Sequence, residues 1–131
     1  MKKITSILVP LFIAGLLVFL AYAALNKIKY SQEQPIKVKS GSEFTITLDS
    51  NPTTGYRWSI ARDIDADHVK LLKNEYKTQQ YARIGQGGKQ IFVFEAVKAG
   101  KTRIYLQYSR PWEEKVPPVD KKIYPIEIEK N

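Results

Sequence analysis

The chain has 131 residues, which suits one domain, and no cysteine, which excludes disulfides, cysteine-ligated zinc and a cysteine nucleophile. Its 21 basic residues outnumber 13 acidic ones, and the formal net charge is +8. Because the basic residues are scattered and mixed with acidic ones, we favour a solvated surface and expect no nucleic-acid partner.

The first predicted element is an apolar segment at the N-terminus. Lys2 and Lys3 precede an uncharged run over residues 4–25, with small residues in an Ala-x-Ala pattern at 21–23. A basic start, an apolar middle and small residues are typical of a secretory signal peptide. The run is also long enough to remain as a membrane anchor, since a span needs about 20 apolar residues.

These features predict three segments along the chain. We expect residues 1–24 to be a signal peptide or membrane anchor, residues 25–35 a polar spacer, and residues 36–131 the folded domain. The protein is then exported, and is either secreted or periplasmic or anchored to the outer face of the cytoplasmic membrane.

The remainder is predicted to be all-β, since short alternating or β-branched runs are separated by turn residues. The run 91–97 is apolar on both faces and is expected at the centre of a sheet, whereas Pro125 indicates an edge or bulge. About seven such strands predict an immunoglobulin-like β-sandwich, preceded by the N-terminal hydrophobic helix. In chain order, the strands are expected near residues 36–38, 44–48, 56–60, 69–80, 91–97, 104–108 and 123–128.

Three of the predicted connections between strands combine residues that bend the backbone with side chains typical of exposed positions. They are every second connection along the chain. If the strands run antiparallel in sequence order, alternate connections share one end of the sandwich, as antibody loops do. We therefore expect one binding surface, made by loops that lie side by side. Its residues are Asn51, Pro52, Thr53, Thr54, Gly55 and Tyr56, then Gly85, Gln86, Gly87 and Gly88, and then Arg110, Pro111 and Trp112.

Local chemistry supports this prediction. Pro52 and Gly55 favour a stiff, projecting turn in the first loop. The glycines of the second loop are expected to expose backbone groups to a partner. Trp112 is a ring of the kind that dominates interface hot spots, whereas Trp58 lies on a strand and is expected in the core. Each loop alone is an ordinary turn, and the three together favour binding.

In this order and spacing, the sequences starting at Asn51 (Asn-Pro-Thr-Thr-Gly-Tyr), Gly85 (Gly-Gln-Gly-Gly) and Arg110 (Arg-Pro-Trp) resemble the chagasin-type inhibitors of papain-like cysteine peptidases. The resemblance covers about residues 35–129. It implies an immunoglobulin-like sandwich, secreted or held at the cell surface, whose three loops enter the active-site cleft of the peptidase.

The resemblance also implies a role for each loop. The first loop would sit over the catalytic cysteine and histidine of the peptidase, with Thr53 and Thr54 closest. The other two loops would contact opposite walls of the cleft, with Trp112 packing on an aromatic residue of the enzyme. No role follows for residues 113–118.

Motifs for catalysis or cofactor binding are incomplete. The glycines at 85–88 lack the third glycine of a dinucleotide fingerprint and the Ser or Thr of a phosphate loop. Asp63, Asp65 and Asp67 have the spacing of a calcium loop, but His68 stands where glycine is needed. The chain has one histidine, His68, which is predicted far from the three loops, so we expect no Ser-His-Asp triad, enzyme activity, cofactor or metal.

The sequence therefore predicts a monomeric, reversible inhibitor of papain-like cysteine peptidases that touches a membrane only through its N-terminal segment, if that segment is retained. A first loop held as a turn offers no scissile carbonyl in extended geometry, so it can fill the cleft without being cut. The alternative is a cell-surface immunoglobulin-like adhesion or assembly module that uses the same loops. A catalytic domain is a third and weaker possibility.

Overall fold

The computed structural model describes residues 13–21, 29–79, 81 and 83–131. Residues 13–21 are helical and belong to the segment predicted as a signal peptide or anchor; the rest of that segment lies outside the described residues. In the described part of the chain, no helix combines the length and the apolar character needed to cross a membrane.

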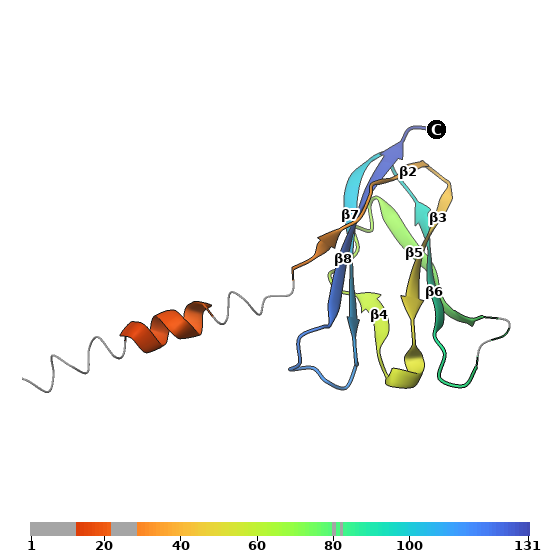
Figure 1. Cartoon of the computed structure of the whole chain (residues 1–131). Helices are drawn as coiled ribbons and strands as arrows, with labels where there is room; N and C mark the ends of the chain where they lie inside the picture. Colours follow the sequence, from red (N-terminus) through yellow and green to blue (C-terminus); the bar gives the residue numbers. More distant parts are fainter. Residues whose placement is uncertain (1–12, 22–28, 80, 82) are drawn as a thin grey trace, which may run out of the picture.

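The domain is a sandwich of two β-sheets (Figure 1). Its strands are β1 (Ser31–Gln32), β2 (Ile36–Lys39), β3 (Glu43–Ser50), β4 (Arg57–Ile60), β5 (Val69–Thr78), β6 (Gly88–Ala96), β7 (Gly100–Ser109) and β8 (Asp120–Glu129). One sheet has the antiparallel order β3-β6-β5. The other has the order β1-β8-β7-β4, with β2 also paired to β8; β1 and β2 run parallel to β8. The predicted all-β sandwich is confirmed, and β6 lies at the centre of its sheet as expected.

The additional strand, β1, lies in the stretch predicted as a spacer. Its two residues are exposed, so they carry no burial pattern that could mark a strand. β1 pairs with residues 122–123 of β8, and β2 pairs with residues 126–129. Pro125, which has no N–H to donate, falls in the gap between these two short partners. The predicted edge at Pro125 is thus a local interruption on one side of β8.

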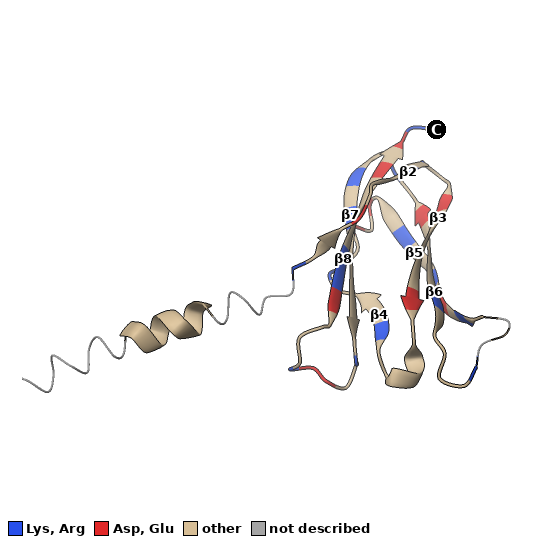
Figure 2. Ribbon diagram, in the orientation of Figure 1, with Lys and Arg blue, Asp and Glu red and all other residues tan. Residues whose placement is uncertain are grey.

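Charged residues of both signs are interspersed along the strands (Figure 2). β5 forms one edge of its sheet and carries Lys70, Lys73 and Lys77. The ammonium groups of Lys73 and Lys77 lie 2.8 and 3.4 Å from the Glu75 carboxylate. Lysines on an exposed edge strand oppose pairing with a strand of another chain.

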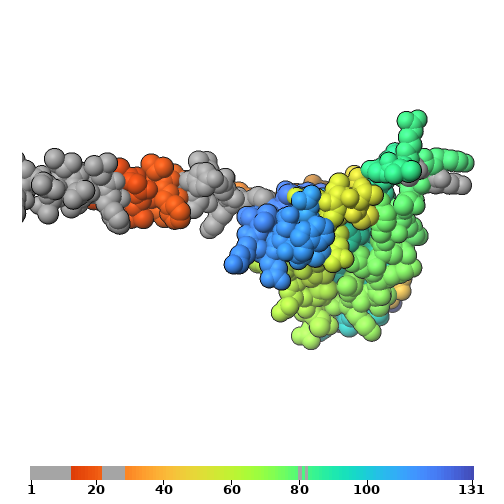
Figure 3. Space-filling view, turned by 90° about the horizontal axis from the view of Figure 1, so that it is seen from below, coloured from red at the N-terminus to blue at the C-terminus, as the bar shows by residue number. Residues whose placement is uncertain are grey.

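Three connections meet at one end of the sandwich, as the alternation of strand direction predicted. They are the first loop (residues 51–56), the second loop (residues 79, 81 and 83–87 of the described chain) and the third loop (residues 110–119), which together we call the loop rim. Figure 1 shows all three at the lower end of the domain, and Figure 3, which looks onto that end, shows the first loop between the other two. The turn between β6 and β7 lies at the opposite end, where the ring of His68 packs against Gly100.

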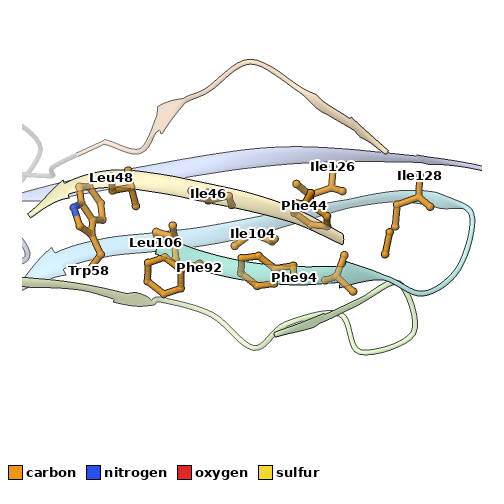
Figure 4. Packing of buried hydrophobic residues seen from close by; sticks show 12 residues of the cluster. Phe44, Ile46, Leu48, Trp58, Phe92, Phe94, Ile104, Leu106, Ile126 and Ile128 are labelled. Carbon is orange, nitrogen blue, oxygen red and sulfur yellow. The ribbon is translucent and has the colours of Figure 1, made fainter. Parts of the chain in front are cut away.

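Inward-facing residues of both sheets form one apolar core (Figure 4). In β3, burial alternates strictly with exposure, as the alternating apolar and polar residues predicted. Since the chain has no cysteine, this core and the strand pairing hold the domain. The buried apolar residues are Phe44, Ile46, Leu48, Trp58, Val69, Phe92, Phe94, Ala96, Ile104, Leu106, Ile126 and Ile128.

Candidate functional site

The first loop is organised around Asn51. Its side-chain Oδ1 accepts the N–H of Thr53 at 3.3 Å, and its carbonyl accepts the hydroxyl of Thr54 at 2.6 Å. These bonds shape the short 3₁₀ turn η1 (Pro52–Thr54), which Gly55 ends with a φ of +83°. Such a positive φ favours glycine. The predicted stiff turn is present, and the threonine hydroxyls satisfy groups within it.

Asn51 also fixes the loop to its surroundings. Its backbone N–H donates to the hydroxyl of Tyr108 on β7 at 3.0 Å. Its side-chain Nδ2 donates to the carbonyl of Gly85 in the second loop, also at 3.0 Å. One residue therefore joins the first loop both to a strand of the sandwich and to the neighbouring loop.

The second loop differs from the expectation that all three of its glycines expose their backbone. Gly85 is exposed and has a φ of +83°, and Gln86 closes the turn by accepting the N–H of Arg83 at 3.0 Å. Gly88, however, is buried at the start of β6, paired in register with residues of β3 and β5.

The glycines at 87 and 88 serve close packing. A β-carbon at Gly88 would overlap the carbonyl of Lys77 and lie 2.7 Å from the hydroxyl of Tyr76. One at Gly87 would lie 3.0 Å from the carbonyl of Ser50. Strand pairing continues as far as Gly88, next to the second loop. The lack of a side chain at Gly87 and Gly88 therefore lets this segment lie close to the backbone of Ser50 and Lys77. Gly88 is buried, so the prediction that it exposes its backbone was wrong.

Large apolar side chains at the tip of the second loop were missed by the sequence prediction. Tyr81 is 89% exposed and Ile84 is fully exposed. Figure 3 shows this loop projecting beyond the body of the domain. The available signal was the presence of large apolar residues within a polar, glycine-rich connection, where no strand partner could bury them.

Arg110 joins the third loop to the first. Its Nε donates to the carbonyl of Thr54 at 3.1 Å, and its guanidinium lies 4.4 Å from the ring centroid of Tyr56. The same guanidinium pairs with the Glu113 carboxylate at 3.2 Å. The run 113–118, for which no role was predicted, thus begins with the residue that holds Arg110 in place.

Trp112 projects from the rim and does not fold back into the core. Its side chain lies against Gly55 and is 68% exposed. Trp58 behaves in the opposite way: it is 4% exposed, and its indole N–H donates to the carbonyl of Asp49 at 2.9 Å. Both tryptophans lie where the sequence predicted them.

Beyond Trp112, the third loop runs back along the outside of the sandwich. Between the loop and the outer face of β4 and β7 lies a groove of about 400 Å³, lined by both polar and apolar side chains, with Val116 52% exposed. The rim therefore presents three neighbouring loops, with exposed apolar side chains in the second and third, and a groove on its flank.

Two side chains beside β8, Glu33 and Tyr124, have shifted pKa values. A hydrogen bond from Lys122, at 3.0 Å, and a second from Ser31 hold the pKa of Glu33 below its usual range. Burial, together with the charges of Glu33 and Asp120, raises the pKa of Tyr124 to about 12. The ion pair between Glu33 and Lys122 links the segment that follows β1 to β8. In the described ranges, no group of three or more acidic or histidine side chains is arranged to hold a metal.

Comparison with known sequences identifies the relatives of this chain. Residues 37–128 match the family described as "Chagasin family peptidase inhibitor I42". Amoebiasin-2 of Entamoeba histolytica is 28% identical over 110 residues, which cover 82% of this chain and 88% of the relative. Chagasin of Trypanosoma cruzi is 30% identical over 80 residues, which cover 59% of this chain and 73% of the relative.

Solved structures give the same result for the fold. The cysteine protease inhibitor EhICP2 from Entamoeba histolytica aligns with a TM-score of 0.62 and 26% identity, over 76% of this chain and 86% of that one. Amebosin aligns with a TM-score of 0.55 and 25% identity, over 81% of this chain and 100% of that one. Since the family match spans most of its length, the chain belongs to the chagasin family of peptidase inhibitors.

Proposed function

We propose that the protein is a reversible inhibitor of papain-like cysteine peptidases, which it blocks by laying the loop rim across the active-site cleft. Membership of a peptidase-inhibitor family and similarity to a solved cysteine protease inhibitor support this proposal. Because these relatives are inhibitors, we assign no catalytic activity to the chain. The observation that carries the cleft-blocking mechanism is the bonding of three loops into one rim through Asn51 and Arg110.

The first loop can enter a proteolytic cleft without becoming a substrate. Peptidases cut a chain that lies extended, with its scissile carbonyl about 3 Å from the nucleophile. Here the N–H of Gly55 donates to the carbonyl of Pro52 at 2.9 Å, and the hydroxyl of Thr54 is bonded to Asn51. Extending this turn would break both bonds, so the loop keeps its shape and escapes cleavage.

Affinity comes from a few exposed anchors on a rigid frame. Trp112 and Ile84 are exposed before binding, so burying them in the enzyme gains contact area. The hydrogen bonds among the loops are already made, so little conformational entropy is lost on docking. The net charge of +8 favours faster association with an acidic peptidase, and this advantage should shrink at high salt.

Export is proposed from the N-terminal sequence alone. The inhibitor would act outside the cytoplasm, either free or tethered by its apolar segment, and as a monomer. Sequencing the N-terminus of the protein purified from its source would distinguish the two forms. A mature chain beginning near residue 24 would indicate cleavage.

The test of the proposed function is inhibition of several papain-like peptidases by the full chain. We expect tight, reversible inhibition from which intact inhibitor is recovered. Trp112→Ala should weaken binding by about 2 kcal/mol, roughly 30-fold, and Thr54→Ala should also weaken it. Leu72→Ala, at an exposed apolar residue on β5, is the matched control and should change nothing.

Two outcomes would contradict the proposal. Absence of inhibition across all the peptidases would remove the function itself. Inhibition that is unchanged in both the Trp112 and the Thr54 variants would remove the three-loop mechanism, even if the protein were an inhibitor.

A further inference from the structure

Tyr108 occupies the point where the core meets the loop rim. It follows Ile104 and Leu106 on the inward-facing side of β7, and its partner in the neighbouring strand is Trp58. The Tyr108 side chain packs against the core and is half-buried. It lies outside the three motifs that mark the rim in the sequence.

The ring of Tyr108 links the core to the third loop through a series of contacts. Its centroid lies 5.1 Å from that of Trp58 and 5.5 Å from that of Tyr56. Tyr56 in turn carries the guanidinium of Arg110 on its face. The path from the buried tryptophan to Arg110 is thus continuous and consists of rigid planar groups.

The polar atoms of Tyr108 reach the rim as well. Its hydroxyl accepts the backbone N–H of Asn51, the residue whose side chain donates to the carbonyl of Gly85. Its backbone carbonyl accepts the N–H of Val119 at 2.9 Å, which closes the base of the third loop. All three loops are therefore connected to Tyr108, either directly or through one intervening residue.

We infer that Tyr108 is a positioning residue for peptidase inhibition: it fixes the first and second loops relative to the third before the enzyme arrives. This inference rests on the proposed function. Tyr108 is half-buried, and it acts on the rim through its contacts with Asn51 and Tyr56. When only a fraction of the free inhibitor has the binding-competent rim, the apparent dissociation constant rises by the inverse of that fraction.

Tyr108→Phe tests this role because it removes the hydroxyl and keeps the ring stack. We expect the inhibition constant to rise about five- to tenfold, through slower association with little change in dissociation. The amide of Asn51 should exchange its hydrogen faster, while the melting temperature changes little. A contact residue such as Trp112 should behave differently, since its loss mainly speeds dissociation.

Tyr105→Phe is the matched control. Tyr105 lies on the same strand, but its ring packs against Tyr30 and Arg62 on the outer face of the sheet. We expect wild-type association and wild-type exchange at Asn51. A second variant, Asn51→Ala, breaks the next link toward Gly85 without removing core packing, and it should also slow association.

The outcomes separate the inference from the function on which it rests. Unchanged association and unchanged Asn51 exchange in Tyr108→Phe, with a wild type that inhibits, would overturn the positioning role alone. Faster dissociation at an unchanged association rate would also overturn it, because it would make Tyr108 a contact residue. A wild type that inhibits no peptidase would overturn the proposed function, and amide exchange at Asn51 would still test the link between Tyr108 and the rim.

Discussion

The indole of Trp112 covers Gly55 so closely that a β-carbon there would overlap the ring and lie 2.9 Å from its Cζ2 atom. Gly55 is also held at a φ of +83°, which residues with a β-carbon rarely adopt. Glycine is thus required at this position for two separate reasons, one in the backbone and one in the contact between the first and third loops.

Gly55→Ala should separate these two requirements when it is compared with Gly41→Ala. Gly41 has nearly the same φ, +85°, but in the described part of the chain no atom lies within 4 Å of the position that a β-carbon would take. Both variants should lose about 1–2 kcal/mol in free energy of unfolding, measured by urea titration. Only Gly55→Ala should also weaken peptidase inhibition, because only there must Trp112 move. Equal inhibition by the two variants would show that the Trp112 contact has no part in binding.

Ile84→Ser should weaken inhibition while leaving stability intact. The side chain is fully exposed at the tip of the second loop, so its loss should change the free energy of unfolding by less than about 0.5 kcal/mol. Burial of a large aliphatic side chain contributes about 1.5–3 kcal/mol, so the inhibition constant should rise at least tenfold if Ile84 enters the enzyme surface. Leu72→Ser controls for the general loss of an exposed apolar group. An Ile84 variant that inhibits like wild type would leave the tip of this loop outside the interface.

Gln90→Ala should destabilise the domain more than any rim variant. The buried amide of Gln90 accepts the backbone N–H of Trp58 at 2.9 Å and donates to its carbonyl at 2.7 Å, so it bridges the two sheets beside β4. Removing it leaves both backbone groups without partners, and we expect a loss of about 2–4 kcal/mol in denaturant unfolding. Gln90→Met fills the same space without hydrogen bonds and should recover only part of the loss. Full recovery by methionine would show that packing, not hydrogen bonding, is the function of this residue.

The ion pair between Glu33 and Lys122 should make stability depend on pH. The pKa of Glu33 is lowered in the folded protein, mainly by its hydrogen bond with Lys122, so folding favours the charged carboxylate. Its contribution is therefore fully present above the unfolded pKa, about 4.3, and is lost as the pH falls through the lower folded value.

This pH dependence can be measured as the difference in unfolding free energy between wild type and Glu33→Gln. The difference should be largest near neutral pH and should vanish at low pH. Glu114→Gln, at an exposed residue of the third loop, is the control for the loss of a carboxylate elsewhere on the surface. A difference between wild type and Glu33→Gln that stays constant from about pH 7 to pH 3 would contradict the assignment.

Much of the fold could be predicted from local patterns. The alternation of apolar and polar residues in β3 predicted its buried face, because successive side chains of a strand point to opposite sides of the sheet. The position of the loop rim followed from strand parity alone. β1 escaped prediction because both its residues are exposed, and Gly88 was misread because only the approach of Lys77 and Tyr76 reveals its packing role.

The sequence by itself determined seven of the eight strands, the turn at Pro52–Gly55 and the family, since alternation, proline and glycine act over a few neighbouring residues. Tertiary structure alone decided how the loops are joined. Asn51 reaches Gly85 across 34 positions, and Arg110 reaches Thr54 across 56. Such contacts depend on strand order and register, which set distances between segments that no local pattern records.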